Sequence, residues 1–215
     1  MKLKKGKETM KRGKFIVLDG IDGCGKGTQA ELSAEYVFEL DKKNHVFLTR
    51  EPYNSRYYAE IRQLLKNSDN PRTDAERMAD LFVKDRKVHT RLIEKILNLG
   101  VHVICDRYKY STLAYQKTQG ISLAKLIKMH RGILVPDLAV IIDVPAIIAL
   151  ERIGNDTKRS HKEVFERRNF MLELRRNFLT LPSAMPKEKI VIVYGNRPIA
   201  EVFAAIKKEI DKILM

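Results

Sequence analysis

Short runs of apolar residues, each ending in a turn-forming or charged residue, recur along this chain of 215 residues. They lie at 15–19, 46–49, 101–105, 138–143 and 189–194. Runs of this length that carry no helical periodicity are typical of strands buried on both faces. The pattern therefore predicts five strands in the interior of the protein.

Longer stretches with a helical pattern separate the strands. They lie at 28–40, 56–67, 74–98, 111–117, 121–131, 145–153, 163–180 and 199–214. Strands that alternate with helices favour an α/β fold in which a five-stranded parallel sheet is flanked by helices. Right-handed crossovers then place the carboxyl ends of all strands at one edge of the sheet, where ligands bind.

Glycine-rich or charged motifs follow four of the five predicted strands. Gly20–Thr28 follows the first strand, Arg50-Glu51-Pro52 the second, Asp106-Arg107-Tyr108 the third, and Gly195-Asn196-Arg197-Pro198 the fifth. Because the strands are expected to be parallel, these motifs should meet at a single edge of the sheet. The pattern thus predicts one composite site.

The length predicts one globular domain over residues 15–215, after a flexible basic tail over residues 1–14. The polar stretch at about 154–162 interrupts two helical stretches and is a candidate lid. No apolar run approaches the ~20 residues of a membrane span. Two cysteines, Cys24 and Cys105, suggest no disulfide framework, so we expect a cytoplasmic protein without membrane partners.

The formal net charge of +14 makes a nucleic-acid partner worth weighing. Part of the excess lies in the basic tail, and the rest is scattered over predicted helices without an RNA-binding aromatic motif. A small polyanionic substrate also accounts for local positive charge. We therefore expect only non-specific nucleic-acid contact by the tail, and we retain a nucleotide-dependent nucleic-acid-binding module as one alternative.

The segment Gly20-Ile-Asp-Gly-Cys-Gly-Lys-Gly-Thr28 carries the strongest chemical signal. It fits G-x-x-x-x-G-K between a predicted strand and a predicted helix, which is the context of a phosphate-binding loop. Glycines allow the backbone to curl so that its N–H groups converge on a phosphate, and the helix start adds a positive dipole end. Those amides would favour a thiolate at Cys24, which gives the hypothesis of oxidation-sensitive activity; the alternative, which we favour, is a small residue that a tight loop tolerates.

Further motifs follow in order along nearly the whole chain. They are Thr49-Arg-Glu-Pro52, Leu81-Phe82-Val-Lys-Asp85-Arg86, Asp106-Arg-Tyr108, Ser111-Thr-Leu-Ala-Tyr-Gln116 and Pro136-Asp-Leu138. With these motifs the chain resembles the thymidylate kinases of the P-loop nucleoside monophosphate kinase group. The resemblance implies a three-layer P-loop NTPase fold with a small lid segment, and transfer of the γ-phosphoryl group of ATP to dTMP with Mg²⁺. It also implies a homodimer.

The resemblance assigns residues to the ATP side of the site. Lys26 would hold the donor phosphates. Asp106 and Thr28 would place Mg²⁺, Asp106 through water. The lid residues Lys158 and Arg159, with Arg152 before them, would close over the transferring group. The complete set expected around ATP is Gly20, Ile21, Asp22, Gly23, Cys24, Gly25, Lys26, Gly27, Thr28, Asn196 and Arg197.

The resemblance also assigns residues to the dTMP side. Arg107 and Arg50 would hold the acceptor phosphate, because arginine presents a planar fork of donors. Asp22 would hydrogen-bond the sugar 3′-hydroxyl. Phe82 would stack on thymine, and Arg86, four residues on along the predicted helix, would bind its carbonyl. The rest of the pocket would come from Tyr53, Ser111, Thr112, Tyr115 and Gln116.

The sequence departs from the family pattern at three places. Gly27 replaces the Ser or Thr that commonly follows the loop lysine, Tyr53-Asn54-Ser55 replaces Gly-Gly-Thr, and Val164 lies where a lid arginine is expected. The main alternative is therefore a related kinase with another acceptor. Glu51-Pro52 also resembles deoxynucleoside kinases, in which the carboxylate acts as a base toward a 5′-hydroxyl.

Overall fold

The structure, a computed structural model, describes residues 11–67, 74–154 and 168–215. Its five strands all run parallel, in the order β2-β3-β1-β4-β5. They are β1 (Phe15–Asp19), β2 (Val46–Arg50), β3 (His102–Asp106), β4 (Leu138–Asp143) and β5 (Ile190–Tyr194). The predicted strands are confirmed, with ends that differ by at most one residue.

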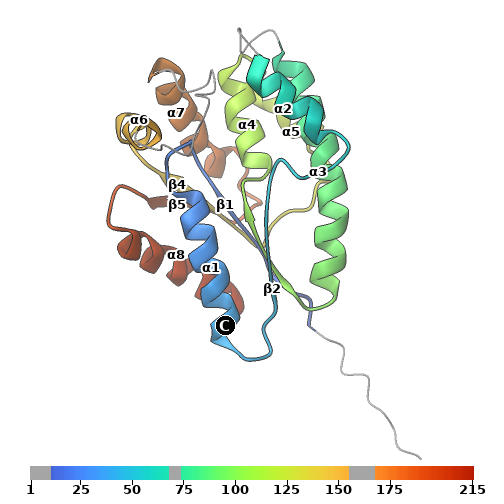
Figure 1. The fold of residues 1–215 in the computed structure, drawn as a ribbon, viewed down its shortest axis with the longest axis vertical. Helices are drawn as coiled ribbons and strands as arrows, with labels where there is room; N and C mark the ends of the chain where they lie inside the picture. The colour runs from blue at the N-terminus through green and yellow to red at the C-terminus, as the bar shows by residue number, and fades with distance from the viewer. Residues whose placement is uncertain (1–10, 68–73, 155–167) are drawn as a thin grey trace, which may run out of the picture.

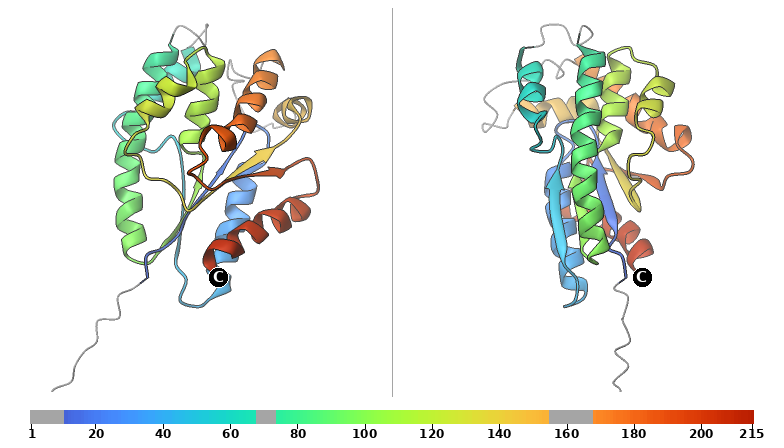
Figure 2. Two further views of the ribbon diagram at one scale, coloured as in Figure 1. Left: turned by 180° about the vertical axis from the view of Figure 1, so that it is seen from behind. Right: turned by 90° about the vertical axis from the view of Figure 1, so that its right-hand side faces the viewer.

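Helices cover both faces of the sheet. They are α1 (Lys26–Leu40), α2 (Tyr58–Asn67), α3 (Ala75–Asn98), α4 (Lys109–Thr118), α5 (Leu123–Met129), α6 (Ala146–Gly154), α7 (Arg168–Ala184) and α8 (Ile199–Leu214). Helices α1 and α8 pack on one face, and α3, α4 and α7 lie on the other (Figures 1 and 2). The three-layer α/β fold is thus confirmed. None of the described helices is long and apolar enough to cross a membrane.

Burial is complete in β1, nearly complete in β3 and β4, and partial at the sheet edges. Every residue of β1 is buried, because helices cover both faces and β3 and β4 flank both edges. At the edge strands, Leu48 of β2 is 41% exposed and Ile192 of β5 is 44% exposed. The runs at 46–49 and 189–194 were predicted to be strands buried on both faces, and this prediction is wrong. Each forms an edge strand with only one neighbouring strand, so part of it stays exposed.

The predicted tail of residues 1–14 is too long by at least two residues. The N–H of Gly13 donates to the carbonyl of Leu97 at 2.9 Å, and the N–H of Lys14 donates to Nδ1 of His102 at 3.1 Å. Gly13 is also fully enclosed, since a Cβ there would lie 2.0 Å from the carbonyl oxygen of Val101. The domain therefore begins before residue 15. Residues 1–10 lie outside the described part of the chain.

Candidate functional site

The loop between β1 and α1 has the backbone shape that the glycine pattern predicts. Gly23 has φ +79°, and a Cβ at this position would lie 2.4 Å from the carbonyl oxygen of Ala149. Gly25, the N-cap residue of α1, has φ +90° with open space around it. Glycine is therefore favoured here by the backbone conformation and not by a lack of space for a side chain. The loop therefore leads directly into the amide end of a 15-residue helix, which is an arrangement that binds anions.

Lys26, the first residue of α1, folds over this loop. Its Nζ donates to the carbonyl of Ile21 at 3.1 Å and lies 3.6 Å from Oδ1 of Asp22. The residue is only 7% exposed. Its charge therefore lies against the phosphate loop, close to where a phosphate bound by that loop would be.

Asp22 joins the loop to α4. Its carboxylate forms an ion pair with Arg107 and accepts a hydrogen bond from the Tyr115 hydroxyl at 2.8 Å. Arg107 Nη1 also donates to Oγ of Ser111 at 3.2 Å. Burial alone would lower the pKa of Arg107, but the charge of Asp22, together with smaller contributions from Tyr115, Asp19 and Asp106, raises it. Four predicted site residues thus meet, with a permanently charged guanidinium beside the phosphate loop.

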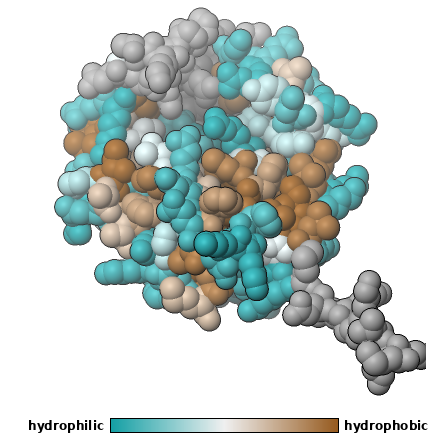
Figure 3. Space-filling model, turned by 60° about the horizontal axis from the view of Figure 1, so that its bottom comes forward, coloured by the Kyte–Doolittle hydropathy of each residue, from teal (hydrophilic) through white to brown (hydrophobic). Residues whose placement is uncertain are grey.

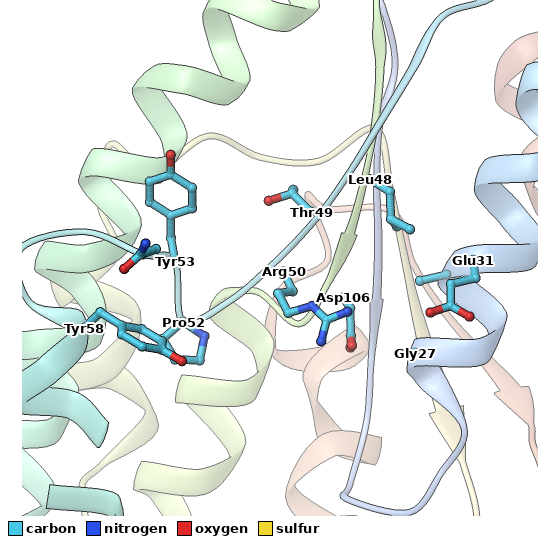
Figure 4. Close-up of a pocket in the computed structure, with 11 residues that line it drawn as sticks. Gly27, Glu31, Leu48, Thr49, Arg50, Pro52, Tyr53, Tyr58 and Asp106 are labelled. Atoms are coloured by element: carbon cyan, nitrogen blue, oxygen red, sulfur yellow. The ribbon is translucent and has the colours of Figure 1, made fainter. Parts of the chain in front are cut away.

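A second group of predicted residues lines an open cavity of about 540 Å³ between α1, β2 and the loop after β2. Arg50 and Asp106 are paired in register at the ends of β2 and β3, and their side chains lie side by side facing Gly27 of α1 (Figure 4). Tyr53 forms part of the opposite wall. The cavity therefore opens onto the start of the loop helix.

The carboxylate of Asp106 fits a magnesium site. Its Oδ1 is buried and has no hydrogen-bond partner in the described structure, and a Cβ added at Gly27 would lie 3.5 Å from its Oδ2. A buried oxygen of this kind normally has a partner, so an ion or its water ligands would satisfy it. Thr28, the residue after Gly27, is exposed.

Arg86 of α3 is enclosed by protein partners. It is 1% exposed, and its Nε donates to Oε2 of Glu51 at 2.7 Å. Its Nη2 donates to Thr112 Oγ1 at 3.1 Å and its Nη1 to Nε2 of His130 at 2.7 Å. Phe82, one turn earlier, is half-buried and packs against the contact between α2 and α3. If Arg86 contacts a base, it has to do so with an N–H group that does not already donate to one of these three partners.

Gln116 offers an acceptor in the same region. It is 2% exposed, its Nε2 donates to Oε1 of Gln119 at 3.0 Å, and its own Oε1 is buried without a partner among the described residues. Leaving such an oxygen unpaired is costly, so a ligand N–H would gain by donating to it.

Tyr53, which stands where the family pattern has small residues, is held rigidly. Its ring stacks on His89 with 4.4 Å between centroids and 4° between planes. Its N–H donates to Oδ2 of Asp85 at 2.7 Å, and Ser55 Oγ donates to Oδ1 of the same carboxylate at 2.6 Å. The changed tripeptide thus builds an aromatic wall.

The remaining predicted ATP-side residues gather near the turn between β5 and α8. Arg152 is exposed, and its guanidinium donates to the carbonyl of Gly23 and to Oδ1 of Asn196, each at 3.4 Å. Arg197 is exposed and lies over the Tyr194 ring at 5.9 Å. The predicted lid beyond Gly154, including Lys158, Arg159 and Val164, lies outside the described residues.

The structure contradicts the hypothesis of a thiolate at Cys24 and agrees with the alternative of a small residue in a tight loop. The residue is 2% exposed, and burial raises the pKa of its thiol despite the opposing charge of Lys26. Facing helix amides does not offset the loss of water around a buried sulfur. The thiol is therefore protonated at neutral pH.

Two acidic residues at the site have partners that sequence reasoning missed. Glu51 is 5% exposed; its Oε2 contacts Arg86, and its Oε1 lies 3.2 Å from Nδ1 of His89. Asp19 is fully buried at the end of β1 and accepts hydrogen bonds from Tyr108 and Ser111. An acidic residue that ends an otherwise apolar strand beside a phosphate loop was the available signal for Asp19.

Comparisons with known proteins agree on one family. The family model described as "Thymidylate kinase" matches residues 18–206. The chain is 37% identical to the "Probable thymidylate kinase" of Methanococcus maripaludis over 207 residues, covering 93% of this chain and 96% of that protein. It is 42% identical to the "Probable thymidylate kinase" of Pyrococcus abyssi over 188 residues, covering 84% and 88%.

A solved structure is similar over nearly the whole fold. The crystal structure of thymidylate kinase from Ehrlichia chaffeensis superposes with a TM-score of 0.72 at 27% identity, covering 93% of this chain and 99% of that one. The five-stranded parallel sheet flanked by helices agrees with this match. The chain belongs to the thymidylate kinase family.

Proposed function

We propose that the protein transfers the γ-phosphoryl group of ATP to a 5′-phosphate oxygen of dTMP, which gives dTDP and ADP. The observation that carries this assignment is the ion pair between Asp22 in the phosphate loop and Arg107 at the start of α4. It places a guanidinium, the preferred partner of a phosphate, directly beside the donor loop. Both substrates are anions, so a site that brings them together needs cations on both sides.

The transfer needs positioning and charge neutralisation more than covalent chemistry. Lys26 and the loop amides hold the ATP phosphates, while Arg107 and Arg50 hold the dTMP phosphate. Asp106 and Thr28 would hold Mg²⁺ through water, and the ion would supply positive charge against the phosphate oxygens. Because every contact is a fixed donor or charge, the rate depends on how accurately the two phosphates are held.

The acceptor nucleoside lies along α3 and α4 in this proposal. Phe82 stacks on thymine while Arg86, Thr112 and Gln116 hydrogen-bond its polar edge. The buried, unpaired Oε1 of Gln116 supports this placement, because it matches the one N–H that the thymine ring carries. Asp22 and Tyr115, which are hydrogen-bonded to each other, face the sugar, and Ser111 and Tyr53 complete the pocket.

The donor nucleoside lies toward β5. Asn196 and Arg197 border the adenine, and Arg152 supports this by linking Asn196 to the phosphate loop. Arg159, in the lid at about 154–162, closes over the transferring group.

The structure weighs against the alternative of a nucleoside acceptor. In that mechanism Glu51 would take a proton from a 5′-hydroxyl, yet one of its oxygens contacts Arg86 and the other lies beside His89. A carboxylate held in a buried ion pair is a poor general base. The nucleic-acid-binding alternative predicts salt-dependent DNA or RNA binding that survives Lys26→Ala.

We also propose a cytoplasmic homodimer. Hydrophobic side chains reach the surface in patches between hydrophilic ones (Figure 3), and such patches often mark interaction sites. Light scattering coupled to size-exclusion chromatography measures the mass directly. A mass near 24.9 kDa would identify a monomer and contradict the dimer.

The direct test is ADP release with ATP and Mg²⁺ in the presence of dTMP, dUMP, dCMP, AMP, thymidine or no acceptor. We expect clear preference for dTMP, and loss of turnover in Lys26→Ala. Preference for thymidine or another nucleotide would overturn the acceptor assignment. Turnover that persists in Lys26→Ala would overturn the assignment of the phosphate loop.

A further inference from the structure

Asp19 makes an unusual number of contacts for one carboxylate. It is 0% exposed and accepts four hydrogen bonds. Its Oδ1 accepts from the N–H of Gly20 at 2.9 Å and from Oγ of Ser111 at 2.6 Å. Its Oδ2 accepts from the N–H groups of Tyr108 at 3.0 Å and Ser111 at 2.9 Å. One buried side chain therefore binds both the first residue of the phosphate loop and the first turn of α4.

The backbone that Asp19 holds is strained. Arg107, the residue before the N-cap of α4, has φ +68°, and it is the only non-glycine residue with positive φ in the described part of the chain. L-residues rarely adopt this conformation unless the surroundings impose it. Here the N–H of Arg107 donates to the carbonyl of Leu18 at 2.9 Å, and the next N–H, that of Tyr108, donates to Asp19.

The same carboxylate also governs where the Arg107 side chain goes. Arg107 Nη1 donates to Oγ of Ser111, and that hydroxyl donates in turn to Oδ1 of Asp19. Asp19 thus holds the N–H of Tyr108, the residue after Arg107, and also the Ser111 hydroxyl that the Arg107 guanidinium contacts. Burial raises the pKa of Asp19, while the charge of Arg107 and hydrogen bonds from the Ser111 hydroxyl and from the N–H groups of Gly20 and Tyr108 oppose that rise.

We propose that Asp19 is a positioning residue that ties the ATP-phosphate loop to the arginine of the acceptor-phosphate site, so that the two reacting phosphates keep a fixed separation. The role of Arg107 toward the acceptor rests on the proposed function. The connection between Gly20 and α4 does not, because it follows from hydrogen bonds within the protein.

The isosteric variant Asp19→Asn tests this role. An amide has one acceptor oxygen where the carboxylate has two, so in either orientation its NH₂ group faces at least one backbone N–H that it cannot satisfy. Shape and volume stay nearly the same. We expect kcat with dTMP to fall by roughly 10²-fold, as misplacement of reacting groups by about 1 Å can do. We expect the dissociation constants of ATP and dTMP, each measured alone, to change far less.

Asp137→Asn is the matched control. Asp137 accepts a hydrogen bond from the N–H of Phe15 at 2.8 Å, at the opposite end of β1, and pairs with Lys14 at 3.5 Å. It therefore also anchors β1, but away from both phosphate sites. We expect Asp137→Asn to keep the wild-type kcat. Equal losses of kcat in the two variants, or a loss in Asp19→Asn that only matches its unfolded fraction, would show that Asp19 is merely structural.

Hydrogen exchange provides a readout that does not depend on the acceptor. ATP alone, binding the loop that begins at Gly20, should slow amide exchange in residues 107–111 of the wild type. In Asp19→Asn the slowing should be confined to the loop itself. Equal protection of 107–111 in both proteins would overturn the proposal. If instead dTMP were not phosphorylated but this difference were observed, the acceptor assignment would fail and the connection would stand.

Discussion

His130 should make the stability of this protein depend steeply on pH in mildly acidic solution. The side chain is 6% exposed and lies between two groups of fixed polarity. Its Nδ1 is 2.7 Å from the carbonyl oxygen of Leu126, which only accepts, and its Nε2 is 2.7 Å from Nη1 of Arg86, which only donates. The native state therefore requires a neutral imidazole with its proton on Nδ1.

The size of the effect follows from the pKa of this residue. Burial, followed by the charge of Arg86, lowers the pKa of His130 to about 3 from 6.5. Between these values the unfolded chain binds a proton that the folded protein excludes, so stability is fully present above pH 6.5 and is lost as the pH falls toward 3. The loss is about 1.4 kcal/mol per pH unit, or roughly 2 kcal/mol between pH 7 and pH 5.

Urea unfolding of the wild type and of His130→Asn, followed by circular dichroism at several pH values from 7 to 5, measures this difference. The variant removes the titrating group and keeps a polar side chain. His102, whose pKa is also lowered by burial, is present in both proteins, so its contribution cancels in the comparison. The wild type should lose about 2 kcal/mol more than the variant over this range. Identical pH dependence in the two proteins would refute the reasoning.

Three further predictions concern the site. Asp106→Asn removes the negative charge of the carboxylate whose Oδ1 is buried without a partner among the described residues, so it should raise the Mg²⁺ concentration needed for half-maximal ADP release. An unchanged Mg²⁺ dependence would contradict the metal assignment. Arg107→Lys should lose at least about tenfold in kcat/KM for dTMP, because a lysine lacks the planar fork that binds Asp22 and Ser111 together, and full activity would show that a point charge suffices. Since burial raises the pKa of Cys24, peroxide should inactivate the wild type and Cys24→Ser at the same rate, and faster loss in the wild type would mean that the thiol is reactive.

The fold could be predicted from the sequence because local patterns determine it. Five apolar runs and the stretches between them define the parallel sheet and its covering helices, and only the helix ends were wrong by more than one residue. Helix α7 was expected to end at 180, before Pro182, but it continues to Ala184. The side chain of Leu181 is fully buried there, and that burial outweighs the amide that Pro182 lacks.

The start of α4 shows what local patterns cannot reveal. The helix was predicted from 111 and begins at Lys109, because the carboxylate of Asp19 accepts from the amides of Tyr108 and Ser111. Helix caps usually come from a neighbouring residue, so a cap 92 positions away leaves no trace in the spacing. Phosphate-binding residues are recognisable because the chemistry fixes their type, whereas the residues that position them can be any group of suitable polarity.

The same reasoning applies to the base-binding side of the site. The spacing of Phe82 and Arg86 on one helix face predicted a pair of base contacts, and nothing in it indicated that Glu51, Thr112 and His130 surround the guanidinium. An arginine side chain has five N–H groups, and these three partners fix the plane of the Arg86 guanidinium, so its remaining N–H groups have little freedom to reorient. Discrimination between bases in this protein should therefore depend on the residues that hold Arg86 as much as on Arg86 itself. A variant such as Thr112→Val, which removes one acceptor without changing the helix, should weaken the preference for dTMP over dCMP in the ADP-release assay, and an unaltered preference would place base recognition elsewhere.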